Sequence, residues 1–134
     1  MPDYNPNGSL RAPVIGDRLD ALTKEGQLVT ELRGWWNDLA NFEADQVIGK
    51  AIEYGSRDLV EIGLDLARIC DRKVSEQEAA ELGVYFYLRG KIARWTESVA
   101  RGERPSDDTL KDIGVYVRMA QRIRSNGGWP GVPQ

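Results

Sequence analysis

Four acidic residues at helical spacing are the side chains of this sequence best suited to chemistry. They form two pairs, Glu78 with Glu81 and Asp108 with Asp112. Carboxylate oxygens are the ligands that hard cations such as Mg²⁺ prefer, so acid pairs on two neighbouring helices can hold such an ion. The chemistry that follows is hydrolysis of a phosphate ester or anhydride, in which Mg²⁺ bridges phosphate oxygens and water is the nucleophile.

Three basic residues are placed to contact the phosphate in such a reaction. Lys91 and Arg94 lie three positions apart, and Lys50 lies on an earlier helical stretch. Each also has a purely structural explanation. Lys50 and Glu53 have the spacing of an exposed ion pair on a helix, and Lys91 and Arg94 can be solvated or paired with neighbouring acids. Beyond these candidate metal and phosphate contacts, the sequence indicates no catalytic residue.

The acids differ in how easily structure alone explains them. Glu78 follows Ser75 by three residues, the spacing of a helix capping box. Asp108 falls in a first helical turn, where the helix dipole favours an acid. Glu81 and Asp112 instead fall on otherwise apolar helix faces, where a carboxylate is costly unless it is paired or binds a cation. We therefore expect Glu81 and Asp112 to be the first metal ligands, with Glu78 and Asp108 second.

Composition excludes most other catalytic chemistry. The 134 residues contain 21 acidic and 18 basic side chains, no histidine and a single cysteine. Histidine-dependent triads, histidine-ligated metals, cysteine zinc sites and internal disulfides are thereby excluded. The formal charge of −3 argues against non-specific binding to nucleic acid, which needs a basic surface.

Apolar residues recur at intervals of three and four, which predicts an all-α fold with no sheet. The expected helices cover residues 17–40, 43–54, 56–69, 75–101 and 105–124. Their short connections favour antiparallel neighbours, so we expect a single-domain bundle of four to five helices over residues 17–124. Proline and glycine predict a flexible, irregular arm at residues 1–16 and an extended tail at 125–134.

Helical wheels place the candidate acids relative to the expected core. The fourth helix carries an apolar stripe at intervals of three and four, which we expect to be buried: Tyr85, Leu88, Ile92, Trp95 and Val99. Extending this stripe backward by four residues reaches Glu81. On the fifth helix, Asp112 falls between Met119 and Ile123 within the apolar arc.

Two stretches of the sequence resemble a known group of proteins. They are Lys50–Leu59, with a Lys-x-x-x-Tyr-Gly element, and the pair of segments Lys91–Trp95 and Asp108–Tyr116. Together they resemble small all-α phage proteins associated with nucleotide modification, which are similar to the MazG-like nucleoside triphosphate pyrophosphohydrolases. The segment from Glu81 to Pro130 also resembles proteins of actinobacterial phages.

The resemblance implies a helical bundle, a homo-oligomer and a nucleotide held through Mg²⁺ between helices. MazG-like enzymes bind the metal through a Glu-Glu-x-x-Glu element on one helix and a Glu-x-x-Asp element on the next. Glu78-x-x-Glu81 matches part of the first element. Three residues before Asp112 stands Thr109 rather than glutamate, so Asp108 would have to take that place.

Two functions follow from these observations. The first is a MazG-like nucleotide-binding protein that hydrolyses nucleoside triphosphates with Mg²⁺. The alternative is a non-catalytic helical protein that binds a host or phage protein through its four tryptophans and five tyrosines. We expect a cytoplasmic protein (in the host cytoplasm if phage-encoded), because the sequence has no signal peptide and no membrane-spanning segment.

Overall fold

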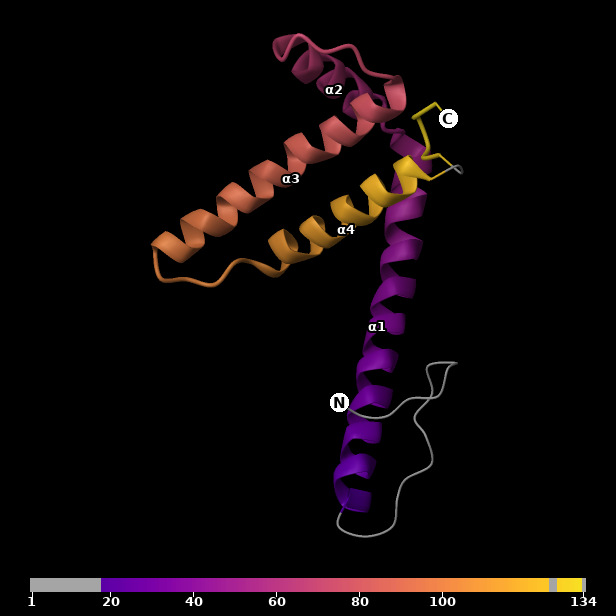
Figure 1. Cartoon of the computed structure of the whole chain (residues 1–134), viewed down its shortest axis with the longest axis vertical. Helices are drawn as coiled ribbons and strands as arrows, with labels where there is room; N and C mark the ends of the chain where they lie inside the picture. Colours follow the sequence, from indigo (N-terminus) through magenta and orange to yellow (C-terminus); the bar gives the residue numbers. More distant parts are fainter. Residues whose placement is uncertain (1–17, 126–127, 134) are drawn as a thin grey trace. The chain divides into compact units, whose positions relative to one another are not determined.

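The computed structural model describes residues 18–125 and 128–133, with side chains described from residue 23 onward. It confirms the all-α fold, with four helices and no strand among these residues. The helices are α1 (Arg18–Tyr54), α2 (Arg57–Ile69), α3 (Glu76–Ala100) and α4 (Asp107–Arg124) (Figure 1). None of them has a stretch long and apolar enough to cross a membrane. The arm expected at residues 1–16 lies outside the described residues.

The predicted break between a helix at 17–40 and one at 43–54 is wrong, because α1 runs through both. Residues 41 and 42, at the expected break, are asparagine and phenylalanine, and neither forces the backbone out of a helix. The glycines of this stretch each cost about 1 kcal/mol relative to alanine, which a long helix tolerates. The chain divides into two units, Met1–Ala44 and Asp45–Gln134.

The core of the second unit lies where α2, α3 and α4 pack together. Its fully buried large side chains are Val60 of α2, Val84 of α3 and Ile123 of α4. Around them α3 contributes mostly small residues, because α2 and α3 approach each other backbone to backbone. A methyl group built on Gly63 would lie 1.6 Å from the carbonyl oxygen of Ala79, and one on Gly83 would lie 2.2 Å from that of Leu59.

Serine side chains begin two of the helices. Ser75 Oγ accepts a hydrogen bond from the backbone N–H of Glu78, and Ser106 Oγ accepts one from that of Thr109. Ser56 stands before α2 but makes no such bond; instead its Oγ accepts a hydrogen bond of 2.9 Å from the indole N–H of Trp129. Trp129 therefore docks on its own chain. Gly131 packs directly against the Ser56 backbone, since a methyl group on it would lie 2.5 Å from the Ser56 nitrogen.

The end of α2 has a backbone conformation that its residue does not favour. Asp71 has a φ of +54°, while Asp71 N–H bonds to the Arg68 carbonyl and Arg72 N–H to that of Ala67. This pair of bonds is the Schellman motif, whose left-handed position favours glycine. We expect Asp71→Gly to raise the free energy of unfolding by about 1 kcal/mol. Thermal denaturation of the two proteins measures this, and a variant less stable than the parent would contradict the assignment.

Candidate binding surface

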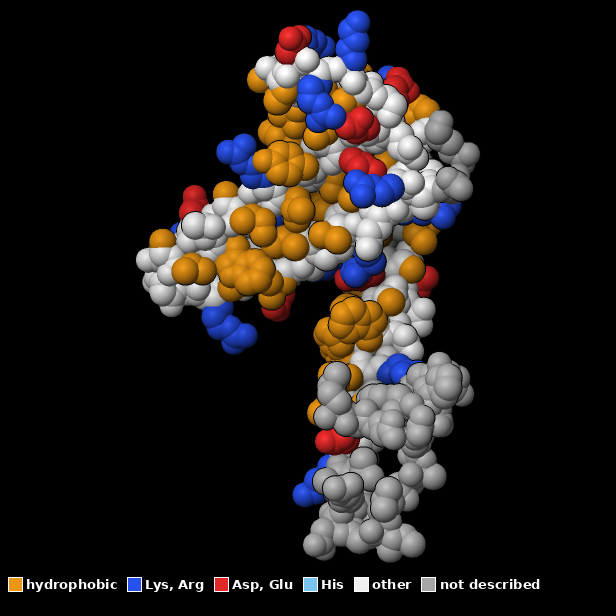
Figure 2. Space-filling view, in the orientation of Figure 1, with side chains coloured by type: hydrophobic (Ala, Val, Ile, Leu, Met, Phe, Trp, Pro, Cys, Tyr) orange, Lys and Arg blue, Asp and Glu red, His pale blue; other side chains and the backbone are white. Residues whose placement is uncertain are grey.

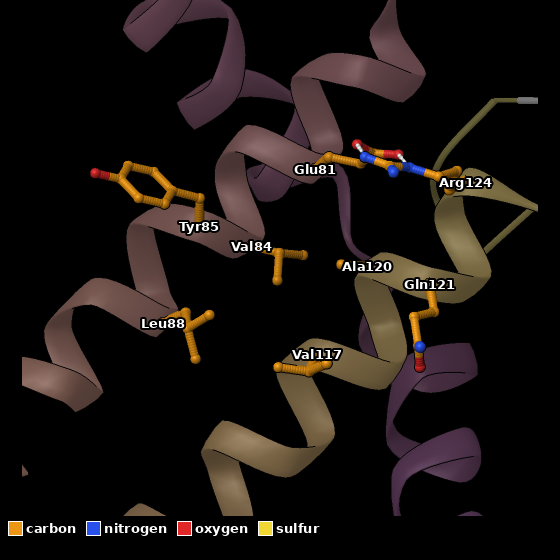
Figure 3. Close-up of a pocket in the computed structure, with 8 residues that line it drawn as sticks. All are labelled: Glu81, Val84, Tyr85, Leu88, Val117, Ala120, Gln121 and Arg124. Carbon is orange, nitrogen blue, oxygen red and sulfur yellow. Dashed lines mark hydrogen bonds and ion pairs between the residues drawn. The ribbon is translucent and has the colours of Figure 1, made fainter.

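Glu81, the first predicted metal ligand, is held by an arginine. Both of its carboxylate oxygens accept hydrogen bonds from Arg124, from Nε at 3.1 Å and from Nη2 at 2.9 Å. This bidentate pair joins the start of α3 to the end of α4 (Figure 3). The bonds to Glu81 raise the pKa of Arg124 above its usual value. The negative charge of Glu81, which we expected to bind a metal ion, is therefore neutralised by Arg124.

Asp112 also forms an ion pair between α3 and α4, at a different position along the two helices. Its carboxylate lies 2.7 Å from the ammonium of Lys91, whose side chain is mostly buried. Glu81 and Lys91 are about 15 Å apart along α3, and Asp112 and Arg124 about 18 Å apart along α4, at 1.5 Å per residue. Because each acid lies beside its own partner, Glu81 and Asp112 do not converge on a shared ion.

The two other acids lie at helix starts, where structure alone explains them. Glu78 is in the first turn of α3 and pairs with Arg72 at 2.8 Å, and Asp108 is exposed in the first turn of α4. In the part of the chain whose side chains are described, no three acidic or cysteine residues form a group able to hold a metal ion. The structure thus does not gather the four predicted ligands, and Mg²⁺ stays a prediction from the sequence.

The predicted phosphate contacts are also dispersed. Lys50 is exposed on α1, Lys91 is paired with Asp112, and Arg94 is exposed on α3. Lys91 and Arg94 do share one neighbour, because the positive charge of both lowers the pKa of Tyr116. Burial and the charge of Asp112 act in the opposite direction and outweigh them, so the pKa of Tyr116 is raised overall.

Tyr116 belongs to a stacked pair that sequence reasoning missed. Its ring lies parallel to that of Tyr87, with centroids 5.7 Å apart, and the Tyr87 hydroxyl donates a 3.0 Å hydrogen bond to Asp58. That bond is the main cause of the raised pKa of Tyr87. The pair ties α2, α3 and α4 together. A sequence signal was available, since Tyr116 lies in the apolar arc of its predicted helix.

The apolar stripe of α3 is not buried as predicted. Its buried face instead carries Ala79, Ala80, Gly83 and Val84, which allow the close approach of α2. The large side chains lie about a third of a turn away, at 100° per residue, next to α4. We define the α3–α4 face as the six large apolar residues of these two helices that remain 37–64% exposed there: Tyr85, Ile92, Trp95, Val99, Leu110 and Val117. Figure 2 shows hydrophobic side chains gathered over α3 and α4.

The face contains a shallow groove of about 350 Å³ between the two helices. The Glu81–Arg124 pair lies at one end (Figure 3), and the rest of the lining consists of Gln121 and five largely apolar side chains: Val84, Tyr85, Leu88, Val117 and Ala120. A mostly apolar groove with one ion pair and the amide of Gln121 offers few polar groups to orient a small substrate. It suits the apolar side of another helix, as in helix-in-groove recognition.

A second apolar surface runs along α1. Five residues spaced by four, three, four and three are 38–59% exposed, and we call them the α1 stripe: Leu28, Leu32, Trp35, Leu39 and Phe42. This is the heptad spacing by which helices pack on one another. Phe42 was missed at the sequence level because the helix was expected to end before it.

Comparison of the chain with models of protein families, with curated proteins and with solved structures gives no match.

Proposed function

We propose that this chain is a non-catalytic binding protein whose α3–α4 face receives an amphipathic helix of a protein partner. One observation carries the proposal: six large apolar side chains stay exposed along one side of a helix pair whose own core is complete without them. Monomeric proteins rarely leave contiguous apolar patches of this kind uncovered. Aromatic residues such as Tyr85 and Trp95 are the residue types that anchor protein interfaces.

The ion pairs of the predicted metal-binding acids support this choice. Each of Glu78, Glu81 and Asp112 forms an ion pair with a basic side chain, in which a carboxylate has its charge already balanced. Binding a cation would require those pairs to break first. A binding function requires no such rearrangement, because the α3–α4 face is exposed as it stands.

Site-specific photo-crosslinking in the producing cell tests the proposal. A photoreactive benzoylphenylalanine replaces Ile92 on the α3–α4 face or, as control, its exposed neighbour Ala93 on another side of α3. We expect a discrete protein adduct from position 92 and none from position 93. Absence of an adduct at 92, or the same diffuse products at both positions, would refute a binding role for the face.

Nucleotide binding, the first function expected from the sequence, is the second proposal. One feature favours it: the positive charges of Lys91 and Arg94 lower the pKa of Tyr116, a member of the aromatic pair. Cations can contact the phosphates of a nucleotide, and an aromatic ring can stack on its base. Release of pyrophosphate from nucleoside triphosphates in the presence of Mg²⁺, abolished by Lys91→Ala, would establish this function. The relationship to phage MazG-like proteins stays a prediction from the sequence.

A further inference from the structure

The α1 stripe and the α3–α4 face have matching dimensions. On α1 the stripe extends from Leu28 to Phe42, and on α3 the face extends from Tyr85 to Val99. Each covers four helical turns, about 21 Å at 1.5 Å per residue. The stripe has apolar residues at alternating intervals of four and three, and the α3 residues of the face have the same pattern once the half-buried Leu88 is included. Two helices pack side by side through this pattern.

The charges beside the two surfaces are opposite. Next to the α1 stripe, three exposed acids follow one another at seven-residue intervals, Glu31, Asp38 and Asp45, and the same row begins with Lys24 before the stripe starts. Beside the α3–α4 face lies an exposed cation, Arg89, between Tyr85 and Ile92 on α3. Lys111 of α4 already donates a hydrogen bond to Gln46 of its own chain, so the complementary charge rests on Arg89. Complementary charges on the two sides of an interface favour correct pairing over alternatives.

We propose that the partner of this face is a second copy of the chain: the α1 stripe of one copy packs on the α3–α4 face of the other. Both surfaces are exposed in the single chain. In a dimer with twofold symmetry each copy gives one stripe and one face, so the same contact occurs twice. This inference rests on the proposed function and specifies its partner.

Charge argues against the simplest rival, in which two α1 stripes pair with each other. When the two α1 helices run antiparallel, that arrangement places the rows of Glu31, Asp38 and Asp45 from two copies opposite each other. Like charges beside a helix interface are destabilising. Pairing with the α3–α4 face replaces that repulsion by attraction.

Crosslinking between two singly substituted chains tests the arrangement. Cys70 is first replaced by serine, so that each chain carries one cysteine, at Trp35 or at Ile92. These positions are the midpoints of their stripes, so they meet whether the helices run parallel or antiparallel. With a short bis-maleimide, we expect the mixture of Trp35→Cys and Ile92→Cys chains to form linked dimers. Replacing the Trp35→Cys chain by Asn37→Cys, on the opposite side of α1, should abolish them.

Charge reversal tests the specificity of the pairing. Asp38→Lys in the Trp35→Cys chain should lower the yield of linked dimers by about tenfold, and Arg89→Glu in the Ile92→Cys chain should restore it. Circular dichroism establishes that each variant stays helical.

Each other result overturns the proposal and shows what replaces it. Links within Trp35→Cys alone would mean that two α1 stripes pair. A chain that carries both cysteines could also form a link within itself. If excess unsubstituted chain does not lower the yield of that link, the face is covered by the α1 of the same chain. If no mixture forms a link but the photoreactive residue at position 92 gives an adduct with a different protein, then that protein is the partner instead of a second copy, and the proposed function still holds. No link and no adduct would refute both.

Discussion

Replacing Gly63 by alanine is expected to destabilise the second unit severely. The added methyl group would lie 1.6 Å from the carbonyl oxygen of Ala79, which belongs to the backbone of α3 and cannot rotate away. The two helices must separate, and overpacking of this kind costs about 3 kcal/mol or more. For a unit of this size we expect the melting temperature to fall by about 12–24 °C.

Gly90 provides the matched control. It also lies within a helix, in α3, but a methyl group built there has no atom within 4 Å. Intrinsic helix propensity then decides the outcome, and Gly90→Ala should raise stability by about 1 kcal/mol. Thermal denaturation followed by circular dichroism measures both variants. Equal effects of the two substitutions would contradict the backbone contact between α2 and α3.

Gly63 and Gly83 also show why part of the fold could not be predicted from the sequence. The periodicity of apolar residues predicts the helices, and the serines before α3 and α4 predict their starts. Which side of α3 is buried depends on how closely its neighbour approaches. The sequence pattern favours the side with the largest apolar residues, whereas the structure buries the side with alanine and glycine. The size of the apolar side chains alone therefore predicts the wrong buried face of α3.

The candidate acids illustrate a similar limit. The helical wheel correctly places Asp112 toward α3, where it lies half-exposed beside Lys91. A wheel describes one helix, however, and does not reveal the level at which a residue meets the next helix. Arg124, which pairs with Glu81, lies 43 residues away in sequence. A partner so distant carries no local spacing signal, so the sequence could not distinguish an ion pair from a metal ligand.

The α1 stripe could be predicted from the sequence only in part. Its leucines and Trp35 follow helical spacing, but the expected end of the helix hid the last member, Phe42. The structure shows one uninterrupted helix, which extends the heptad pattern over four turns. A stripe of this length on a helix, left exposed, is typical of a helix that packs on a partner.

Ile92→Asp is expected to weaken association through the α3–α4 face strongly. Ile92 lies at the midpoint of the α3 part of this face, and is 46% exposed. An aspartate there would be desolvated without a partner whenever a helix packs on it. Loss of a central anchor of an interface costs about 2 kcal/mol, which weakens association by about 30-fold. Ala93→Asp introduces the same charge one residue away, outside the face, and should leave association unchanged.

Sedimentation of the labelled chain in a lysate of the producing cell tests the binding role of the α3–α4 face most directly. The single cysteine, Cys70, is exposed and accepts a fluorescent label. The parent chain and Ala93→Asp are expected to sediment faster than a free chain of 15.0 kDa. Ile92→Asp is expected to sediment at the rate of the free chain. A parent chain that sediments as a free monomer, or the same rate for all three proteins, would contradict this account.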